Sequence, residues 1–461
     1  MAARVGLLPL YLELYDRAMP EVRPTVEAFA NAVAGALADH GLDVAPAPVC
    51  RVADEFRCAV RQFEQEGVAC LVTLHLAYSP SLESADAIAG SRLPIIALDT
   101  TPDAAFGPQT DPAAIMANHG IHGVQDLCSV LRRRGRPYAV VAGHWRAPET
   151  LARVAEWARA AELATALRTA RVGLIGEPFR GMGDFAVTER RLREAIGIDV
   201  LPCGRPAIAE FLPGPGDAEI QRETTALLER CQASDLPDAA LRASVRASLA
   251  VRRWIARERL DAFSVNFLAV GRDSGLPTMP FLETSLAMSR GVGYAGEGDV
   301  LTAAFVASVA KRFPASFTEM FCPDWEGGTV FLSHMGEANL DLLEGRPALL
   351  CRPFPWADVE PPVAAVGCFR AGEAALLNLA PGPADTFGFV AALGEMVAPV
   401  GEDRLRECVR GWFRPATALP AFLEAYSLAG GTHHLAVAYG SGVIEELERA
   451  AALLGWSFTR V

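Results

Sequence analysis

The sequence predicts an α/β protein with two doubly wound, Rossmann-like parallel-sheet domains and a β-rich C-terminal domain. Short apolar runs alternate with longer helical patterns from the N-terminus to about residue 325, which is typical of parallel sheets. After about residue 326, short strand-like runs are separated by glycine and proline turns, which favours a barrel or sandwich. We therefore predict an N-terminal α/β domain (residues 1–170), a central α/β domain (171–325) and a C-terminal β-rich domain (326–461).

The N-terminal domain alternates strands and helices throughout. Apolar runs predict strands at Val5–Tyr11, Ala69–Leu76, Pro94–Leu98 and Tyr138–Ala142. Helical patterns predict helices at Val22–His40, Ala53–Glu66, Pro112–Arg134 and Pro148–Ala170. Because ligands of doubly wound sheets bind beyond the carboxyl ends of the strands, we expect a cleft at that edge.

The central domain begins with a predicted strand at Arg171–Gly176. The loop that follows contains Gly181 and Gly183 but neither the GxGxxG nor the GxxxxGK[ST] pattern, so we interpret it as a strand-end loop at a cleft rather than a nucleotide site. Further helices are predicted at Val187–Ile196, Glu219–Arg230, Pro237–Arg259 and Val300–Val309, and a further strand at Asp261–Leu268.

The C-terminal domain is predicted from short apolar runs between turns. These strands are expected at Thr329–Leu332, Ala348–Arg352, Val363–Phe369, Glu373–Leu379 and His434–Ala438. A final helix, Val443–Leu454, is expected to pack on them.

The composition excludes several classes of function. The net charge of -13 argues against a nucleic-acid binder and against binding to anionic membranes. The 10 cysteines are scattered singly without a CxxC pair, which argues against a zinc ribbon and favours a reducing compartment. No signal peptide or membrane span is evident, so we expect a cytoplasmic protein. With 51% hydrophobic and 21% charged residues, the chain is expected to be well buried and oligomeric.

Four ionisable residues on separate segments form a candidate metal-binding set. Carboxylates and imidazoles together suit Mn²⁺, Co²⁺, Zn²⁺ or Mg²⁺. The residues are 22, 15 and 100 positions apart, so they can meet only through the fold. In chain order they are Glu297, Glu319, His334 and His434.

Each member of this set also has a structural interpretation. Glu297 stands among glycines directly before a predicted helix, where the helix dipole favours a carboxylate. Glu319 lies in the apolar run Phe317–Phe321, where a buried carboxylate needs a partner. His334 fits a hydrogen-bonded core histidine equally well, and His433 and His434 follow two glycines in a polar loop.

The chemistry open to such a set is the interconversion of an aldose and a ketose through a cis-enediol(ate) intermediate. One carboxylate removes the proton from the carbon next to the carbonyl, and the other handles protons on the oxygens. A divalent cation polarises those oxygens and stabilises the intermediate.

Five motifs together resemble those of the L-arabinose isomerase family, within the wider arabinose/fucose isomerase group. Their order and approximate spacing match the family along nearly the whole chain. They are GHW (Gly143–Trp145), GYAGEGDVLTAA (Gly293–Ala304), FTEMF (Phe317–Phe321), SHM (Ser333–Met335) and AGGTHH (Ala429–His434).

The resemblance implies a Mn²⁺-dependent aldose–ketose isomerase of carbohydrate metabolism, with Co²⁺ or Mg²⁺ as substitutes, that assembles as a homo-oligomeric hexamer or tetramer. It implies that Glu297 and Glu319 are both metal ligands and the acid/base pair. His334 and His434 complete the ligand set, and His433 lies beside the substrate. His122, with His119 as the competing assignment, would reach a neighbouring subunit's site, so that the active site lies at a subunit interface. His144 is interpreted as structural.

The segment expected to recognise the sugar differs from the family pattern. Family members have Gln-His-Leu-Tyr-Gly after the first strand, whereas this chain has Leu10–Asp16, with no glutamine and with two acidic residues, Glu13 and Asp16. If they face the site, these carboxylates disfavour an anionic sugar, which would need an arginine such as Arg180. The resemblance implies an L-arabinose- or L-fucose-like sugar as substrate, and D-galactose, other deoxy or branched aldoses and substituted hexoses stay open. A catalytically inactive sugar-binding protein and an epimerase with the same metal site are the alternatives.

Overall fold

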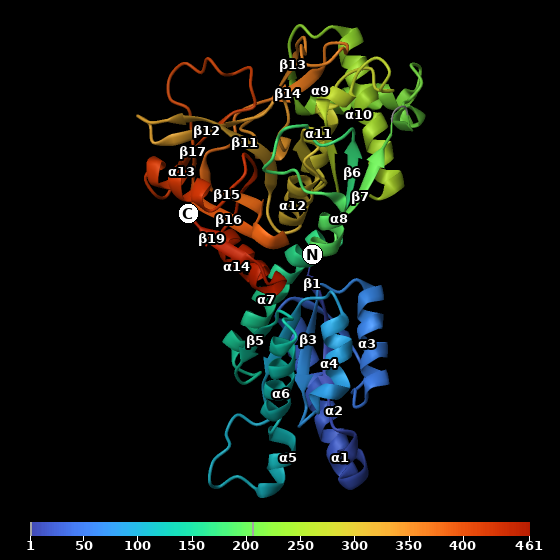
Figure 1. Cartoon of the computed structure of the whole chain (residues 1–461), viewed down its shortest axis with the longest axis vertical. Helices are drawn as coiled ribbons and strands as arrows, with labels where there is room; N and C mark the ends of the chain where they lie inside the picture. The colour runs from blue at the N-terminus through green and yellow to red at the C-terminus, as the bar shows by residue number, and fades with distance from the viewer. Residues whose placement is uncertain (1, 205–206) are drawn as a thin grey trace. The chain divides into compact units, whose positions relative to one another are not determined.

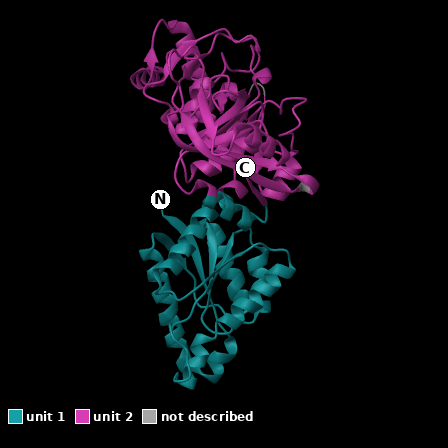
Figure 2. Ribbon diagram, turned by 90° about the vertical axis from the view of Figure 1, so that its left-hand side faces the viewer, with its two compact units in different colours: residues 1–165, 445–456 teal, residues 166–444, 457–461 magenta. Residues whose placement is uncertain are grey.

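The computed structural model describes residues 2–204 and 207–461, and the chain divides into two compact units. Unit 1 comprises Met1–Thr165 and Glu445–Trp456, and unit 2 comprises Ala166–Ile444 and Ser457–Val461 (Figure 2). The predicted division into three domains at residues 170 and 325 stays a prediction beside this two-unit grouping. Among the described residues, no helix combines the length and the apolar character that crossing a bilayer requires.

Unit 1 is built on a five-stranded parallel sheet in the order β2-β1-β3-β4-β5. The strands are β1 (Ala3–Leu10), β2 (Leu42–Pro46), β3 (Cys70–His75), β4 (Ile95–Asp99) and β5 (Ala139–Ala142). The main helices are α2 (Arg23–Asp39), α3 (Ala53–Glu66), α4 (Ser81–Gly90), α6 (Ile121–Arg133) and α7 (Pro148–Arg168) (Figure 1). This arrangement confirms the doubly wound fold class.

One predicted helix of unit 1 is wrong in extent. The segment Pro112–Arg134 is not continuous, because a short turn (Pro112–Ala114) and α5 (Ile115–Asn118) precede α6. The break lies at Gly120, where a Cβ atom would approach the His75 carbonyl oxygen to 2.4 Å. The backbone therefore passes too close to the end of β3 for a side chain at this position.

Unit 2 contains a second parallel sheet, in the order β10-β9-β6-β7. Its strands are β6 (Arg171–Ile175), β7 (Asp199–Cys203), β9 (Ala262–Val265) and β10 (Gly293–Gly296). Its main helices are α9 (Ala218–Arg230), α10 (Asp238–Glu258), α11 (Phe281–Ser289) and α12 (Val300–Ala310). Two central-domain predictions needed correction, at Asp261–Leu268 and at Val187–Ile196.

The predicted strand at Asp261–Leu268 ends at Val265, because the Asn266 side chain accepts a hydrogen bond from the Leu268 amide (3.0 Å) and begins a 3-10 turn. The predicted helix at Val187–Ile196 is shorter than expected. It consists of the short α8 (Glu189–Arg191), capped by Thr188, followed by one π-helical turn (Leu192–Ile196).

The rest of unit 2 is the predicted β-rich part. Six strands close into a mostly antiparallel barrel, because β15 pairs with both β18 and β16, and β19 adds to β16. The six strands are β11 (Ala315–Asp324), β12 (Thr329–Ser333), β15 (Gly372–Pro381), β16 (Phe387–Val397), β17 (Gly411–Pro415) and β18 (His434–Ala438), and the added seventh strand is β19 (Ser457–Arg460). A small separate sheet joins β8 (Gln232–Ala233), β13 (Ala348–Cys351) and β14 (Val363–Val366). Helix α13 (Leu419–Leu428) completes the region, whereas α14 (Val443–Leu454), which was predicted to pack on the C-terminal strands, belongs to unit 1 from Glu445 on.

A shared hydrophobic core fixes the barrel strands against the helices of unit 2. Leu332 of β12 and Leu435 of β18 are fully buried in the same cluster as Leu249 of α10 and Leu282 of α11. Burying such a side chain stabilises the fold by about 1.5–3 kcal/mol. The ends of β12 and β18, which carry His334 and His434, are therefore held by packing.

Candidate metal centre

The four predicted metal-binding residues meet at one point of unit 2. We refer to Glu297, Glu319, His334 and His434 as the cluster. Glu319 belongs to β11, His434 begins β18 and His334 directly follows β12, and β11 lies between the other two strands. In the register of these strands, Glu319 is opposite Ser333 on one side and His434 on the other. The fourth member, Glu297, directly follows β10 of the parallel sheet.

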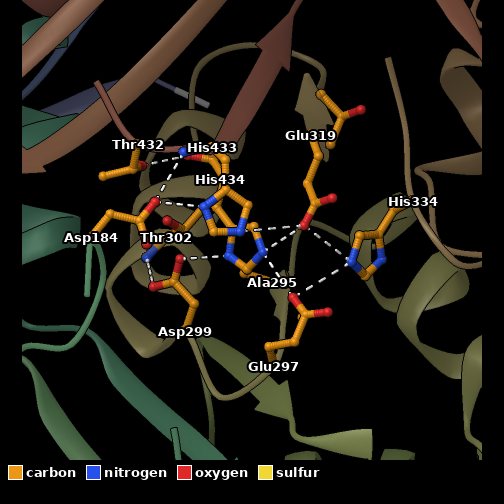
Figure 3. Close-up of polar contacts among 12 residues, drawn as sticks. Asp184, Ala295, Glu297, Asp299, Thr302, Glu319, His334, Thr432, His433 and His434 are labelled. Atoms are coloured by element: carbon orange, nitrogen blue, oxygen red, sulfur yellow. Dashed lines mark hydrogen bonds and ion pairs between the residues drawn. The ribbon is translucent and has the colours of Figure 1, made fainter. Parts of the chain in front are cut away.

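The side chains of the cluster point toward a common centre (Figure 3). One ligand atom from each residue lies within 4.8 Å of the others. The His434 Nε2 atom is 2.8 Å from a carboxylate oxygen of Glu297 and 2.8 Å from one of Glu319. The His334 Nε2 atom is 3.7 Å and 3.5 Å from the same two oxygens. The geometry thus brings two carboxylates and two imidazoles together.

The glycines beside Glu297 are required by close packing. A Cβ atom on Gly296 would lie 2.8 Å from the His334 ring, and one on Gly298 would lie 2.7 Å from the Pro178 Cα atom. Glu297 itself has a φ of 56°, in the left-handed region that non-glycine residues rarely adopt. Such strain is typical of functional sites, and here it directs the carboxylate toward the two histidines.

Each imidazole of the cluster is held from behind by a further carboxylate. The Nδ1 atom of His434 lies 2.9 Å from Asp299, and the Nδ1 atom of His334 lies 2.6 Å from Glu337. Because carboxylates only accept hydrogen bonds, both Nδ1 atoms carry a hydrogen, and each Nε2 atom faces the centre, where it can bind a metal once its own proton is lost. This is the usual arrangement of metal-binding histidines.

The two supporting carboxylates are themselves fixed. Asp299 caps α12 by accepting a hydrogen bond from the Thr302 amide (2.9 Å), and Glu337 accepts one from the Tyr294 hydroxyl (3.0 Å). Sequence reasoning missed both residues. The available signals were that Asp299 lies two residues after Glu297 and that Glu337 lies three residues after His334.

The electrostatics of the cluster favour positive charge at its centre. Burial would lower the pKa of His334, but the carboxylates of Glu337 and Glu297 raise it to about 10. The pKa of His434 is likewise raised well above its usual value, against the effect of burial, by Asp299 and the two cluster carboxylates. Burial would raise the pKa of Glu297, yet the two histidines hold it below its usual range. Imidazole protons or a divalent cation can supply the positive charge.

The donor set fits a divalent cation. The Nε2 atom of His334 is buried and has no hydrogen-bond partner among the described residues, although it faces two carboxylate oxygens. Leaving a buried polar atom unpaired costs about 1–3 kcal/mol, which a metal bond removes. Mixed imidazole and carboxylate donors suit Mn²⁺ and related first-row ions.

His433, predicted to lie beside the substrate, is at the open side of the cluster. Its side chain is 37% exposed, and its Nε2 atom lies 3.7 Å from Glu319. Its Nδ1 atom lies 2.5 Å from Asp184, a residue that sequence reasoning missed. The adjacent Phe185 stacks on His434, with ring centroids 4.8 Å apart and planes 8° apart. The only sequence signal for these two residues was the glycine-containing loop just before them.

His122 and its competitor His119 belong to unit 1. The His119 ring contacts the Tyr15 hydroxyl through Nε2 (3.0 Å) and the Ile115 carbonyl through Nδ1 (2.8 Å). His122 is exposed on α6, and no hydrogen bond of its ring is found among the described residues. His144, interpreted as structural, lies 3.3 Å from the Pro102 carbonyl oxygen.

The acidic segment after β1 is less negative than its sequence suggests. The Asp16 carboxylate pairs with Arg23 at 3.0 Å and with Arg51 at 2.7 Å. Glu13, by contrast, is exposed, with only a 3.7 Å contact to Arg17. The Asp16 charge is therefore compensated by two arginines, and the effect of the two carboxylates on an anionic sugar stays a prediction.

Comparisons with known proteins show which family shares the segments that contain these residues. The sequence model of the L-arabinose isomerase central domain matches residues 218–312, and that of the C-terminal domain matches residues 314–456. All four cluster residues lie within these two segments. The recognition of the family from its motifs is thereby confirmed.

Full-length relatives agree with the domain matches. An L-arabinose isomerase from Nocardioides sp. is 30% identical, over 82% of this chain and 77% of the relative. Those from Mycolicibacterium smegmatis and Acidothermus cellulolyticus are 28% and 27% identical, over 69% and 82% of this chain and 65% and 77% of their own lengths. Among solved structures, a periplasmic solute binding protein from Actinobacillus succinogenes with bound D-allose covers 67% of this chain and 90% of its own, at 13% identity. Its TM-score of 0.18 is too low to indicate a shared fold.

Proposed function

The chain belongs to the L-arabinose isomerase family and is a sugar isomerase by class. We propose that it interconverts an aldose and a ketose with a divalent metal bound by the cluster. The observation that carries this proposal is that four residues from two different sheets converge within 4.8 Å. A purely structural ion-pair group would not need both imidazoles directed by a second carboxylate.

The cluster residues would hold Mn²⁺, with Co²⁺ or Mg²⁺ as substitutes. When bound, the ion would polarise the sugar's carbonyl and hydroxyl oxygens. Asp299 and Glu337 would keep the His434 and His334 rings in the ligating tautomer. A histidine binds a metal as the neutral ring. Metal binding would therefore release the protons that His334 and His434 otherwise retain.

Glu297 and Glu319 would serve as the acid/base pair. Glu297 stays ionised near neutral pH because its pKa is lowered, so it is in the state required of a base. Glu319 is the more accessible of the two, with a side chain that is 13% exposed. One carboxylate would remove the proton next to the carbonyl to give the cis-enediol(ate), and the other would move the proton between the two oxygens.

The proposed substrate is an uncharged aldose, with L-arabinose and L-fucose-like sugars first. His433 would contact it from the open side of the cluster. His122 of a neighbouring subunit would complete the site in a hexamer or tetramer. The supporting observation for His122 rather than His119 is that the His119 ring is engaged by Tyr15 and Ile115.

The test is an aldose panel assayed for ketose formation with Mn²⁺, after EDTA treatment and after Mn²⁺ is restored. We expect activity that EDTA abolishes and Mn²⁺ restores, and a loss of at least a thousandfold in Glu297→Gln and Glu319→Gln, on the order of the loss of an essential catalytic group. In D₂O, NMR should find deuterium at the carbon next to the carbonyl. Sugar binding without ketose formation would favour a binding protein, and an epimeric aldose would favour an epimerase.

A further inference from the structure

The loop after β6 is attached at both ends to residues of the candidate metal centre. We call residues 177–185 the clasp. At its start, the Phe179 amide donates to the Glu297 carbonyl oxygen (2.8 Å), and the Asn266 side chain donates to the Glu177 carbonyl oxygen (2.6 Å). The clasp therefore begins against the backbone of a proposed metal ligand.

The end of the clasp contacts both histidines of the AGGTHH motif. A single carboxylate oxygen of Asp184 accepts hydrogen bonds from the His433 backbone amide (3.1 Å) and from its ring Nδ1 (2.5 Å). Phe185 is buried and covers the His434 ring. Figure 3 shows Asp184 on the side of His433 away from Glu319. Asp184 and His433 are 249 residues apart in the chain.

These contacts determine whether the exposed Nε2 atom of His433 donates or accepts a hydrogen bond. Because the Asp184 carboxylate can only accept a hydrogen bond, the His433 tautomer that it stabilises carries its hydrogen on Nδ1. The Nε2 atom is then an acceptor, and it lies 3.7 Å from Glu319, too far for a hydrogen bond between them. The backbone bond to the same oxygen also fixes the position from which the ring extends.

We propose that Asp184 is a positioning residue that orients His433 so that its Nε2 atom accepts a hydrogen bond from a sugar hydroxyl bound beside Glu319. This inference rests on the proposed function and deepens it by naming how the substrate is held. Asp184 acts through His433 and does not itself touch the sugar.

The partial exposure of the pair favours this role over a purely structural one. The side chains of Asp184 and His433 are 34% and 37% exposed, and ion pairs this accessible contribute little to stability. Phe185 and the clasp's start already attach the loop to the site through buried packing and backbone hydrogen bonds. The carboxylate is therefore available for orienting the ring.

The experiment is a double-mutant cycle on the full-length Mn²⁺-loaded enzyme, with KM, kcat and Mn²⁺ affinity measured separately. Asp184→Ala should raise KM about tenfold or more while kcat changes less than threefold, as for the loss of binding shared by ground and transition states. Asp184→Asn, whose amide oxygen can still accept both hydrogen bonds, should recover most of the KM defect. In a His433→Ala background, Asp184→Ala should add nothing, because its effect passes through the ring.

Two controls separate positioning from general damage. Asp341→Ala removes a partly exposed ion pair with Arg230 elsewhere in unit 2 and should leave KM unchanged. The Mn²⁺ affinity of Asp184→Ala should stay within twofold of wild type. An unchanged KM, additive effects in the cycle, an Asp184→Asn variant as impaired as Asp184→Ala, or a matching loss of Mn²⁺ affinity would each overturn the proposal.

A readout that does not depend on catalysis keeps this inference distinguishable from the proposed function. In protein labelled with ¹⁵N-histidine, the His433 signals, assigned by their absence in His433→Ala, should show hydrogen on Nδ1 in wild type and a tautomer mixture in Asp184→Ala. If wild type isomerises no aldose on the panel, the proposed function fails while this measurement still decides the orienting contact.

Discussion

Replacing Asp299 tests whether a carboxylate behind His434 tunes the metal centre. Asp299 has two structural roles, because one carboxylate oxygen accepts from the Thr302 amide at the start of α12 and the other contacts the His434 Nδ1 atom. Asp299→Ala removes both roles. Asp299→Ser keeps a good helix cap but is too short to hold the imidazole, so the pair of variants separates the two effects.

The magnitudes follow from these contacts. Loss of a supporting partner of a metal-binding histidine typically weakens metal binding 10–100-fold, which is about 1.4–2.7 kcal/mol. We expect this loss in both variants. Loss of the cap costs about 1 kcal/mol of folding stability, and we expect that additional cost only in Asp299→Ala.

The assay combines titration calorimetry of Mn²⁺ into the metal-free protein with urea unfolding of the same preparations. A matched comparison is Glu337→Gln, whose amide oxygen can still accept from His334 and should lose less affinity than Asp299→Ser. The reasoning is refuted if Asp299→Ser binds Mn²⁺ as tightly as wild type, since the carboxylate would then act only as a helix cap.

Further predictions concern the stability of the fold. His75 is fully buried in unit 1, neither ring nitrogen has a hydrogen-bond partner among the described residues, and burial lowers its pKa to about 3. As pH drops, the unfolded chain takes up the His75 proton before the folded protein does, so the free energy of unfolding should fall by about 1.4 kcal/mol per pH unit from about pH 6.5 toward 3. We expect His75→Gln to lack this part of the loss when urea unfolding is compared at pH 7 and pH 5. An equal loss in the variant and the wild type would contradict the assignment. Gly293→Ala would place a Cβ atom 2.1 Å from the Ala303 carbonyl oxygen, so we expect a loss of about 1–3 kcal/mol, with a neutral effect on the melting temperature as the contrary result.

The sequence was sufficient to predict which residue types form the site. It was not sufficient to predict how strand pairing and neighbouring carboxylates hold these residues in place. Glu319 and His434 are 115 positions apart, yet β11 and β18 pair them directly, a register that only the closed barrel sets. Asp299 is unremarkable in sequence because an N-terminal helix cap fully explains an aspartate there. Asp184 becomes visible only when the loop after β6 meets the start of β18.

Strand β10 (Gly293–Gly296) was not predicted from the sequence. The first residue of β10 lies too close to α12 to carry a side chain and is therefore a glycine. The strand also lacks the β-branched residues that usually indicate a strand. The same close approach explains why the motif around Glu297 resembles a flexible loop in sequence. In the structure it is a buried strand followed by one strained residue, Glu297, with a φ of 56°.

The segment that the family resemblance connects with sugar recognition and the candidate metal centre lie in different units of the chain. The cluster and its supporting carboxylates all lie in unit 2, within the residues that the family's central and C-terminal domain models match. The segment Leu10–Asp16, which lacks the family's glutamine, lies in unit 1. There the Asp16 carboxylate is paired with two arginines, so the replacement has not simply made a negative surface. We therefore expect that substitutions in Leu10–Asp16 change the preferred sugar while the residues proposed to bind the metal and move the proton stay the same.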